Sequence, residues 1–474
     1  MASLWANQSC DPFTGRDAQC VVGTYVQYAV NVSDVDQISK TVKFAKDKNI
    51  RFVIKNTGHD YFGKSTGAGA ISVWTHNLKS IEVIDWQGAH YSGSAFRAGS
   101  GVQGFEAIQF GSLHDLVAVT GSCPTVGLAG GYTQGGGHSA LASKFGLAAD
   151  NALEFEVVDG SGDVLIANRE ENSDLFWALS GGGGGTYGIV SRITVRAHQT
   201  FPVSAYAMAF PITSVSTDVL KGAMSSIQSI FPTLVDLGIQ VVNSLSSGSF
   251  SVSIMAPNIS SNDMGQLLAS FHTYLDQNGV TYTPTTAAYD TYGDFYGSGV
   301  GSESYVNVEG GSWLIPRSIA LDPDKAQVYN DAVLDTAAMG ATVGTLGFNV
   351  SKVVAGDVDN AVLEAWREAL YYTLIVIPEP LNETITDGLE RLVTIERDIM
   401  SKFKAIAPES GAYLNEASAG DLDWKTDFYG ANYDRLLSVK NKYDPDHFFY
   451  GRTAVGSDYW VEQDDKRLCL ANAQ

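Results

Sequence analysis

Apolar side chains recur at helical spacing in several stretches of this chain, and the clearest stretch is residues 34–46. The positions that fall on one helix face are Val35, Ile38, Val42 and Ala45. Ser33 precedes them and an acidic residue, Asp36, follows three positions later, which is the signature of a capped helix start. The pattern predicts an amphipathic helix that packs this face against the core.

Two later stretches, 260–279 and 386–406, show the same periodicity and predict further helices. Their apolar positions are Met264, Leu267, Leu268, Phe271 and Leu275 in the first, and Leu389, Leu392, Ile399 and Phe403 in the second. Stripes of this kind are typical of core-facing helix surfaces and not of cofactor contacts. We therefore expect both helices to cover a hydrophobic core.

Runs rich in β-branched and aromatic residues predict strands. Before residue 199 these runs lie at 51–56, 70–75, 80–85 and 116–122, with a helix at 102–113 and a hairpin at 151–168 around Gly-Ser-Gly. After residue 199, apolar strands alternate with capped helices, and the strands are expected at 205–212, 249–257, 311–320 and 368–378. The mixed order predicts an α+β protein with a domain boundary near residue 199.

Composition narrows the classes of partner. The chain has 474 residues, of which 45% are hydrophobic and 17% charged, so it can bury more than one core. Its formal net charge of −22 disfavours nucleic acid and anionic membranes, because both would repel such a surface. No run approaches the roughly 18 apolar residues of a membrane-spanning helix. We expect a soluble protein that acts on neutral or cationic small molecules.

The cysteines and sequons favour the secretory route, although the first ten residues have neither the basic region nor the apolar core of a signal peptide. Cys10 and Cys20 lie close together and are suited to a short-loop disulfide, while Cys123 and Cys469 are left over. No CxxC or HxxxH spacing offers a metal site. N-glycosylation sequons occur at Asn7, Asn31, Asn258, Asn349 and Asn382.

Residues 58–65, GHDYFGKS, match the phosphate-loop pattern GxxxxGK[ST] of nucleotide hydrolases. A true phosphate loop joins a strand to a helix, whose first amides grip the phosphates. Here the next residues are TGAGAISVWTH, which predict a strand, so the sequence disfavours a nucleotide hydrolase. The overlapping GxSxG match at 63–67 also lacks the strand-turn-helix context of a nucleophile elbow.

Two glycine-rich stretches, 130–151 and 180–195, lie between strand signals. Glycine is needed where a backbone turns sharply or approaches a flat or charged ligand closely. Neither stretch fits the GxGxxG-helix-acid arrangement of a Rossmann site. The alternatives are a pair of flexible loops or two walls of a cofactor site, and the strand signals on both sides favour the walls.

Four motifs resemble the berberine bridge enzyme-like flavoproteins of the vanillyl-alcohol oxidase (PCMH-type FAD) superfamily, in particular a fungal secreted branch. They are KNTGHDYFGKSTGAG, GSCPTVGLAGGYTQGGGHSALASKFGLAADN, GGGGGTYGIV and FYGANYDRLLSVKNKYDPDHFF. The resemblance implies a PCMH-type FAD-binding domain of two α/β subdomains at 21–198. It also implies a substrate domain at 199–415 with a large antiparallel sheet backed by helices, and a segment at 416–474 that returns to the first domain.

The resemblance implies FAD attached through two residues, His59 at the flavin 8α-methyl carbon and Cys123 at ring position 6. Alone, either residue would be an ordinary turn histidine or an inert buried thiol. Val126 matches the position where valine leaves space for dioxygen, and Gly131 departs from a histidine found in many plant members. The other implied cofactor contacts are Asn56, Thr57, Gly58, Asp60, Gly63, Gly127, Gly135, Gly136, Gly137, Asn151, Gly188, Val190, Tyr429, Asn432 and Tyr433.

The family's catalytic base often comes from a Y-x-N-Y strand, which reads Tyr413-Leu-Asn-Glu416 here. Glu416 is therefore the expected base, with its pKa shifted modestly upward by the pocket, and Tyr413 lies three residues before it. The alternative is that Glu416 is an ordinary polar or salt-bridged residue. Tyr371 and Tyr372 are further candidates, but one of two consecutive strand residues must point away.

Three functions stay open at this point. The first is a secreted FAD oxidase, acting as a monomer, that takes hydride from an alcohol such as a sugar or oligosaccharide hydroxyl and reduces dioxygen to hydrogen peroxide. The second is an oxidative cyclase or dehydrogenase of natural-product biosynthesis. The third is a low-turnover, secreted flavin-binding protein.

Overall fold

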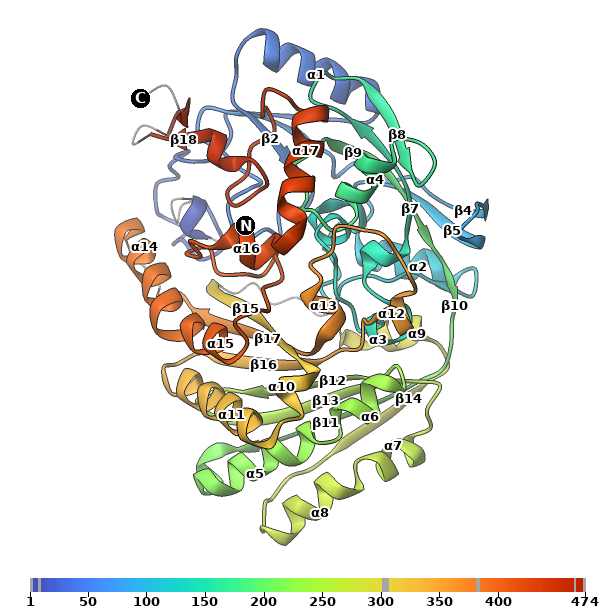
Figure 1. Cartoon of the computed structure of the whole chain (residues 1–474), viewed down its shortest axis with the longest axis vertical. Helices are drawn as coiled ribbons and strands as arrows, with labels where there is room; N and C mark the ends of the chain where they lie inside the picture. The colour runs from blue at the N-terminus through green and yellow to red at the C-terminus, as the bar shows by residue number, and fades with distance from the viewer. Residues whose placement is uncertain (1–2, 7–9, 301–306, 381–383, 464–465, 472–474) are drawn as a thin grey trace.

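A computed structural model of the chain describes residues 3–6, 10–300, 307–380, 384–463 and 466–471. Its α+β architecture has two halves (Figure 1). The smaller sheets lie in the upper half, and a seven-stranded antiparallel sheet lies in the lower half with helices beneath it. The fold class therefore agrees with the prediction, while the domain limits 21–198, 199–415 and 416–474 stay predictions.

A three-stranded parallel sheet starts the upper half, in the order β1 (Tyr28–Asn31), β3 (Ile71–Trp74) and β2 (Phe52–Lys55). The predicted helix connects β1 to β2 as α1 (Val35–Asp47) and buries Ile38, Val42 and Ala45 as expected. Its cap is Asp34 and not Ser33, because Asp34 has the extended backbone and its carboxylate accepts the Gln37 amide at 2.9 Å.

A five-stranded antiparallel sheet forms the other α/β unit of the upper half, and α2 (Gly104–Ser112) and α4 (Ser173–Leu179) accompany it. Its strands in spatial order are β4 (Ile81–Gln87), β5 (Ser92–Gly99), β9 (Ile189–Arg196), β7 (Ala152–Val158) and β8 (Val164–Asn168). β7 and β8 are the predicted hairpin. The strand predicted at 116–122 is wrong in length, since only β6 (Leu116–Val117) pairs, with β10 (His198–Gln199).

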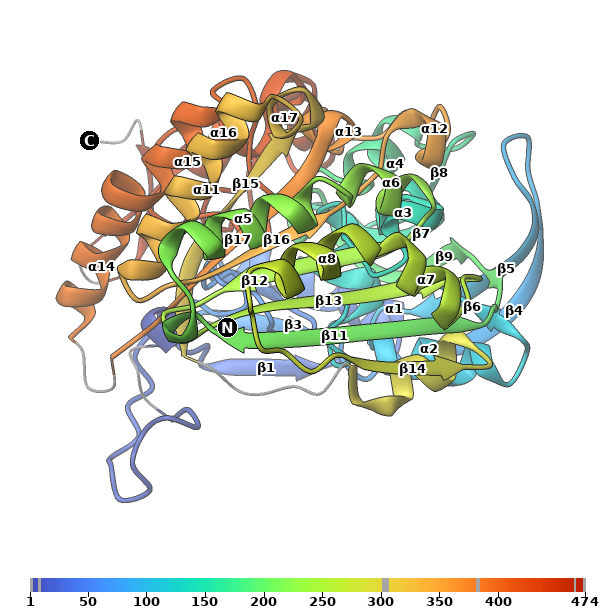
Figure 2. The same ribbon diagram turned by 90° about the horizontal axis from the view of Figure 1, so that it is seen from below.

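The seven-stranded sheet carries its helices on the face turned away from the upper half. Figure 2, the view from below, shows α5 (Thr217–Gln228), α8 (Ala269–Gln277) and α11 (Pro323–Ala338) in front of the strands. The strands in spatial order are β14 (Thr285–Tyr289), β11 (Val203–Pro211), β13 (Ser249–Pro257), β12 (Gln240–Leu245), β16 (Thr342–Gly347), β17 (Ala369–Pro378) and β15 (Val308–Pro316). Phe250, Phe271 and Tyr329 are fully buried between the two layers.

Three predictions for this half need correction. The strand expected at 311–320 ends at Pro316, because proline has no backbone N–H to continue the strand ladder, and α10 (Arg317–Ala320) follows. The helix expected at 260–279 is two helices, α7 (Ser261–Leu267) and α8, which meet at Leu268. Residues 385–406 form α14 (Ile385–Thr394), η6 (Ile395–Met400) and α15 (Ser401–Ile406), but Leu389 is 44% exposed and not a core residue.

The C-terminal segment returns to the upper half, where α17 (Tyr433–Tyr443) packs on α4 (Figure 1). Lys442 and Tyr443 both bond to Asp174 at the start of α4. Inside the segment, the buried Lys440 ammonium bonds to Asp444 at 2.6 Å and to the Thr186 and Phe449 carbonyls. Two more elements, α16 (Trp424–Tyr429) and η7 (Gly430–Asn432), precede α17.

The remaining elements are short and connect the sheets. They are η1 (Ser3–Ala6), η2 (Leu128–Tyr132), α3 (Ala142–Phe145), η3 (Ala148–Asn151), η4 (Ile212–Ser214), α6 (Phe231–Asp236), α9 (Tyr292–Phe295), η5 (Tyr296–Val300), α12 (Lys352–Ala355), α13 (Ala365–Glu368), η8 (Ser457–Tyr459) and the hairpin β18 (Trp460–Glu462) with β19 (Leu468–Leu470).

The Cys10–Cys20 disulfide is confirmed, with the two Cα atoms 5.1 Å apart. Of the sequon asparagines, Asn31 and Asn258 are exposed, whereas the Asn349 amide is half-buried and donates to Asp236. Asn7 and Asn382 lie outside the described residues. Among the helices that the structure describes, none is both long and apolar enough to cross a membrane.

Candidate functional site

A large cavity opens between the loops of the upper half, the segment that joins α15 to α16 and the C-terminal segment. It contains about 1580 Å³ of empty space, including its open mouth. Its walls come from the loop after β2, the loop at 121–129, the two glycine-rich stretches, the segment before α16 and the segment after α17. The predicted site residues on its walls are Asn56, Thr57, Gly58, His59, Asp60, Cys123, Val126, Gly127, Gly188, Val190, Tyr413 and Glu416.

The loop after β2 is held against the neighbouring strands. The Asn56 amide donates to the Thr75 hydroxyl at 2.9 Å and to the Ser100 carbonyl at 2.5 Å, and Trp74 Nε1 donates to the Asn56 carbonyl at 3.0 Å. Gly58 has φ +86°, a conformation that a side chain would strain. The chain then continues to β3 without entering a helix, so the loop is not a phosphate loop of the hydrolase type.

His59 and Cys123 reach the same cavity from loops 64 positions apart in sequence. His59 Nε2 lies 2.7 Å from the Thr125 hydroxyl, two residues after Cys123. The Thr125 carbonyl in turn accepts from the Gln103 amide at 2.8 Å, next to the start of α2. The Cys123 side chain is exposed to the cavity. These contacts fix the two predicted attachment residues on one wall.

Glycine makes another wall flat. A Cβ on Gly127 would lie 1.8 Å from Asn56 Oδ1, and a Cβ on Gly188 would lie 2.4 Å from the Val157 side chain. A Cβ on Gly184 would lie 2.7 Å from the Cα atom of Gly131. Neighbouring side chains and backbone therefore lie too close to these three positions for a side chain to fit, and the glycines leave bare backbone in this wall, which suits a planar ring system.

Polar atoms in the cavity indicate that the walls fit a cofactor such as FAD. Asn56 Oδ1, Asp60 Oδ1, Ser100 Oγ and Gln134 Oε1 are buried and have no hydrogen-bond partner among the described residues. A buried polar atom without a partner costs about 1–3 kcal/mol, so such atoms are normally satisfied by protein, water or ligand. All four residues line this cavity, where hydroxyl and amine donors of a dinucleotide could satisfy the three acceptor oxygens and the Ser100 hydroxyl could donate to an acceptor atom of the same ligand.

Several predicted cofactor residues lie behind the walls. Gly63 is in a neighbouring cavity, where a Cβ would lie 2.7 Å from Trp5. The run Gly135, Gly136 and Gly137 packs beneath Tyr132, Tyr413 and Asn415, so it supports the cavity without lining it. The Asn151 amide donates to the Phe145 and Leu147 carbonyls.

The C-terminal candidates also bond to protein atoms. The Tyr429 hydroxyl donates to the Thr453 carbonyl, the Asn432 amide donates to the Ala361 and Val362 carbonyls, and the Tyr433 hydroxyl accepts from the Gly456 amide. Each of these contacts stays within the C-terminal segment or joins it to the loop before α13. Tyr429, Asn432 and Tyr433 therefore stabilise the C-terminal segment, which forms part of the cavity wall.

Glu416 is the centre of a polar cluster at the cavity wall. His138 Nε2 lies 3.2 Å from its Oε2 atom, and the Tyr372 hydroxyl donates to the same oxygen. Burial acts to raise the pKa of Glu416, but the charge of His138 and the hydrogen bonds from His138 and Tyr372 outweigh it and lower this pKa. The expected upward shift was therefore wrong in sign, and the carboxylate is ionised near neutral pH.

Tyr372 is fully buried and touches the cavity only through Glu416. Burial, together with the charge of Glu416, raises the pKa of Tyr372, so its hydroxyl stays protonated and donates. Tyr371 points to the opposite face of the sheet, 5.4 Å from the Tyr329 ring, as expected for consecutive strand residues. Tyr413 lines the cavity, and its hydroxyl accepts from the Asn415 amide at 2.8 Å.

His138 was missed by the sequence analysis. It stands at the end of the glycine run 135–137, which gave the only local signal of its importance. Its imidazole is surrounded by four aromatic rings that come from three segments of the seven-stranded half and the segment before α16. The ring centroids lie 5.7 Å away in Phe348, 6.3 Å in Trp366, 5.0 Å in Tyr372 and 5.3 Å in Tyr413.

Comparison with known proteins gives two family matches, an "FAD binding domain" over residues 26–168 and "Berberine and berberine like" over residues 412–456. The FAD-linked oxidoreductase patO of Penicillium expansum is 40% identical over 478 residues, covering 99% of this chain and 83% of the relative. The bifunctional decalin synthase calF of Penicillium decumbens is 39% identical over 473 residues, covering 98% and 82%.

A VAO-type flavoprotein oxidase, VAO615 of Thermothelomyces thermophilus, is 38% identical over 481 residues, covering 99% of this chain and 83% of the relative. The crystal structure of the VAO-type flavoprotein MtVAO615 from Myceliophthora thermophila C1 superimposes with a TM-score of 0.92 at 36% identity, covering 99% of this chain and 87% of that one. A chitooligosaccharide oxidase structure, at 19% identity and a TM-score of 0.74, covers 91% and 92% and shares the fold.

Proposed function

This chain belongs to the berberine bridge enzyme-like FAD-linked oxidoreductases, and we propose that it is an oxidase whose FAD is attached through both His59 and Cys123. The observation that carries the proposal is the convergence of both residues with Glu416 on one cavity. Attachment at two points would hold the flavin ring in one place and raise its tendency to accept electrons. The Thr125 contact to His59 keeps the two attachment loops together.

The proposed reaction is the oxidation of an alcohol to a carbonyl compound. Bound FAD would supply the acceptor for the hydride of the substrate carbon, and dioxygen, as the second substrate, would be reduced to hydrogen peroxide. Glu416 accepts the hydroxyl proton, because it is ionised and faces the cavity. His138 and Tyr372 act through Glu416 and are positioning residues, since they orient its carboxylate and stabilise its charge.

Dioxygen as the second substrate has two supports. Val126 lines the cavity three residues after Cys123, at the position where the family resemblance leaves space for oxygen. VAO615, which is 38% identical to this chain, carries the name flavoprotein oxidase. Sugar or oligosaccharide alcohols remain within the proposed substrate class.

A second candidate is an oxidative cyclase or dehydrogenase in natural-product biosynthesis. The decalin synthase calF, 39% identical over 98% of this chain, favours it. The same cavity would serve both functions, because each begins with proton removal by Glu416 and hydride transfer from carbon. The proposal also includes a monomer that is secreted and glycosylated. The Cys10–Cys20 disulfide supports secretion, and the exposed Asn31 and Asn258 sequons support glycosylation.

Flavin attachment is tested by precipitating the protein with acid. We expect yellow colour to stay in the pellet for the wild type and for the single variants His59→Ala and Cys123→Ala, and to be lost from the double variant. Cys469→Ala is the matched control, because Cys469 lies in β19 and not in the cavity. Free flavin released from the wild-type pellet would disprove covalent attachment.

The substrate class is tested with anaerobic flavin bleaching and with peroxide release in air. Bleaching and peroxide release with a primary alcohol or sugar would support the alcohol oxidase. Bleaching with an aromatic or polyketide-like substrate alone, without release of peroxide, would support the second candidate and overturn the first.

A further inference from the structure

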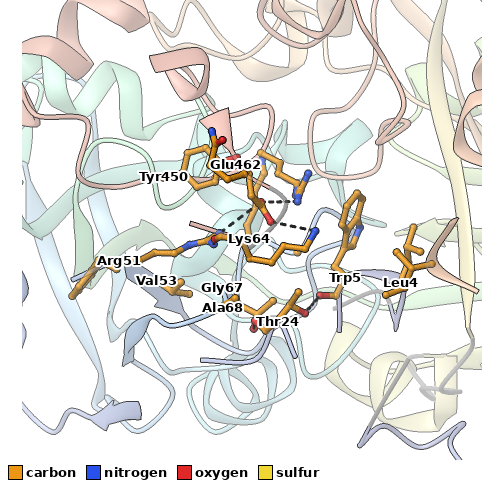
Figure 3. A pocket seen from close by; sticks show the side chains of 18 of the residues that line it. Leu4, Trp5, Thr24, Arg51, Val53, Lys64, Gly67, Ala68, Tyr450 and Glu462 are labelled. Carbon is orange, nitrogen blue, oxygen red and sulfur yellow. Dashed lines mark hydrogen bonds and ion pairs between the residues drawn. The ribbon is translucent and has the colours of Figure 1, made fainter. Parts of the chain in front are cut away.

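A second cavity lies on the other side of the loop 60–67 and has no place in the proposed reaction. It contains about 1060 Å³ of empty space, including its mouth. Figure 3 shows Arg51, Lys64 and Glu462 extending into this space, with Trp5 on one side. The residues of the GKSTG motif that resembled a phosphate loop, namely Gly63, Lys64, Thr66 and Gly67, form part of its wall.

The lining of this second cavity is cationic, although the whole chain carries a net charge of −22. Four basic side chains line it, and they are Arg51, Lys64, Arg452 and Lys466. Among the lining residues that the structure describes, the acidic one is Glu462, which by itself cannot neutralise all four. Excess positive charge in a concave site of low dielectric attracts anions strongly.

The Glu462 carboxylate forms a hydrogen bond with one of its basic neighbours and lies farther from the other two. Its Oε2 atom lies 2.8 Å from Arg452 Nη2, a charge-assisted hydrogen bond. Arg51 Nη2 and Lys466 Nζ are 3.9 Å and 3.8 Å from the carboxylate, beyond hydrogen-bond distance. The Arg51 and Glu462 side chains are only 15% and 14% exposed, so bulk water screens this cluster weakly.

Lys64 forms the boundary between the two cavities, since it lines both. Within the described parts of the chain its ammonium has no ion pair, and it lies 5.2 Å from the centre of the Phe62 ring. Burial lowers the pKa of Lys64 to about 8, although Asp60 acts to raise it. An anion in the second cavity would stabilise the charged form of this side chain.

The walls that hold these cations are fixed by packing. The Arg452 guanidinium lies 4.5 Å from the centre of the Trp5 ring, and Arg51 donates to the Lys466 carbonyl at 2.7 Å. The Thr24 hydroxyl donates to the Trp5 carbonyl, which ties the first residues to this wall. A Cβ on Gly67 would lie 2.8 Å from Arg51 Nε, so glycine lets the arginine lie flat on the loop.

We propose that this second cavity is a binding site for a small oxyanion, a phosphate or carboxylate group, held by Arg51, Arg452 and Lys466 beside the GKSTG loop. Guanidinium groups match oxyanions by two parallel hydrogen bonds, and the lysine adds a mobile point charge. The site is separate from the flavin cavity, because neither Arg452 nor Lys466 lines the latter.

The test is isothermal titration calorimetry, in which the purified holoenzyme is titrated with inorganic phosphate and, in a second series, with citrate. We expect one site per chain, and an affinity at least tenfold weaker in the double variant Arg452→Gln/Lys466→Gln. Lys352→Gln is the matched control, because Lys352 is an exposed lysine on α12, away from both cavities, and it should bind like the wild type. Tighter binding of phosphate than of citrate would indicate a phosphate ligand, and the reverse order would indicate a carboxylate ligand.

The flavin absorption spectrum shows whether the variants are folded. If the double variant does not accumulate, Lys466→Gln alone, which removes a half-exposed ammonium, should still weaken binding severalfold. Equal binding by wild type and variants, or binding of neither anion, would overturn the proposal and leave an ion-pair cluster that only anchors the C-terminal hairpin.

Discussion

His138 Nε2 lies 3.2 Å from Oε2 and 3.3 Å from Oε1 of Glu416, although the two residues are 278 positions apart in the chain. The contact joins the end of a glycine run in the upper half to the segment that follows the seven-stranded sheet. It gives a half-buried carboxylate a partner that favours its ionised form.

Replacing His138 with asparagine should raise the pKa of Glu416. The charge of His138 lowers this pKa in the folded protein, whereas burial raises it, so burial prevails once the histidine is gone. Glu416 must be ionised to accept a proton, and activity is therefore lost as pH falls through its pKa. We expect the acid limb of the pH profile of kcat/KM to move to higher pH. His90→Asn, at an exposed position, should leave the profile unchanged.

Glu416→Gln should lower the rate of flavin reduction by about 10²–10⁴-fold, the range for loss of a general base, while the bound flavin keeps its absorption. Tyr372→Phe should have a smaller effect, because it removes one hydrogen bond to the carboxylate and not the carboxylate itself. Stopped-flow bleaching under anaerobic conditions measures both. A Glu416→Gln enzyme of wild-type rate would exclude this residue as the base.

Gly127→Ala should lower the flavin content of the purified protein. The new Cβ would lie 1.8 Å from Asn56 Oδ1, so Asn56 must give up its bonds to Thr75 and Ser100 and the loop before His59 must shift. The ratio of flavin to protein absorbance measures the effect. Gly265→Ala is the control, since its Cβ would meet no atom within 4 Å and it lies in α7.

Arg367→Met should destabilise the protein by about 3–5 kcal/mol, the cost of leaving one partner of a buried ion pair alone. Arg367 makes two hydrogen bonds, at 2.8 and 2.9 Å, to Asp150, and the side chains are 6% and 1% exposed. The pair ties α13 to η3 across the two halves. Urea denaturation measures the change. Arg317→Met, which breaks an exposed pair with Asp236, should cost only about 0–1 kcal/mol.

Most helices and strands could be predicted from local sequence patterns, and the resemblance of four motifs to a flavoprotein family indicated which loops would bind the cofactor. The apolar face of residues 34–46 fixed α1, because helical periodicity is a local property, and the motif around His59 and Cys123 pointed to a flavin. The ends of elements were harder to predict. The cap of α1 is Asp34 and not Ser33, and β15 ends at Pro316, because the exact ends depend on local backbone angles.

Contacts between distant segments became visible only in the folded structure. Neither the sign of the Glu416 pKa shift nor the role of His138 could be read from the sequence, because both depend on a contact between distant segments. The sequence likewise did not show that the GKSTG motif lies beside Arg51, Arg452 and Lys466, because these residues come from opposite ends of the chain and meet only in the folded protein. Electrostatic interactions depend on the distance between charged groups, and for groups far apart in sequence this distance is set only when the sheets pack together.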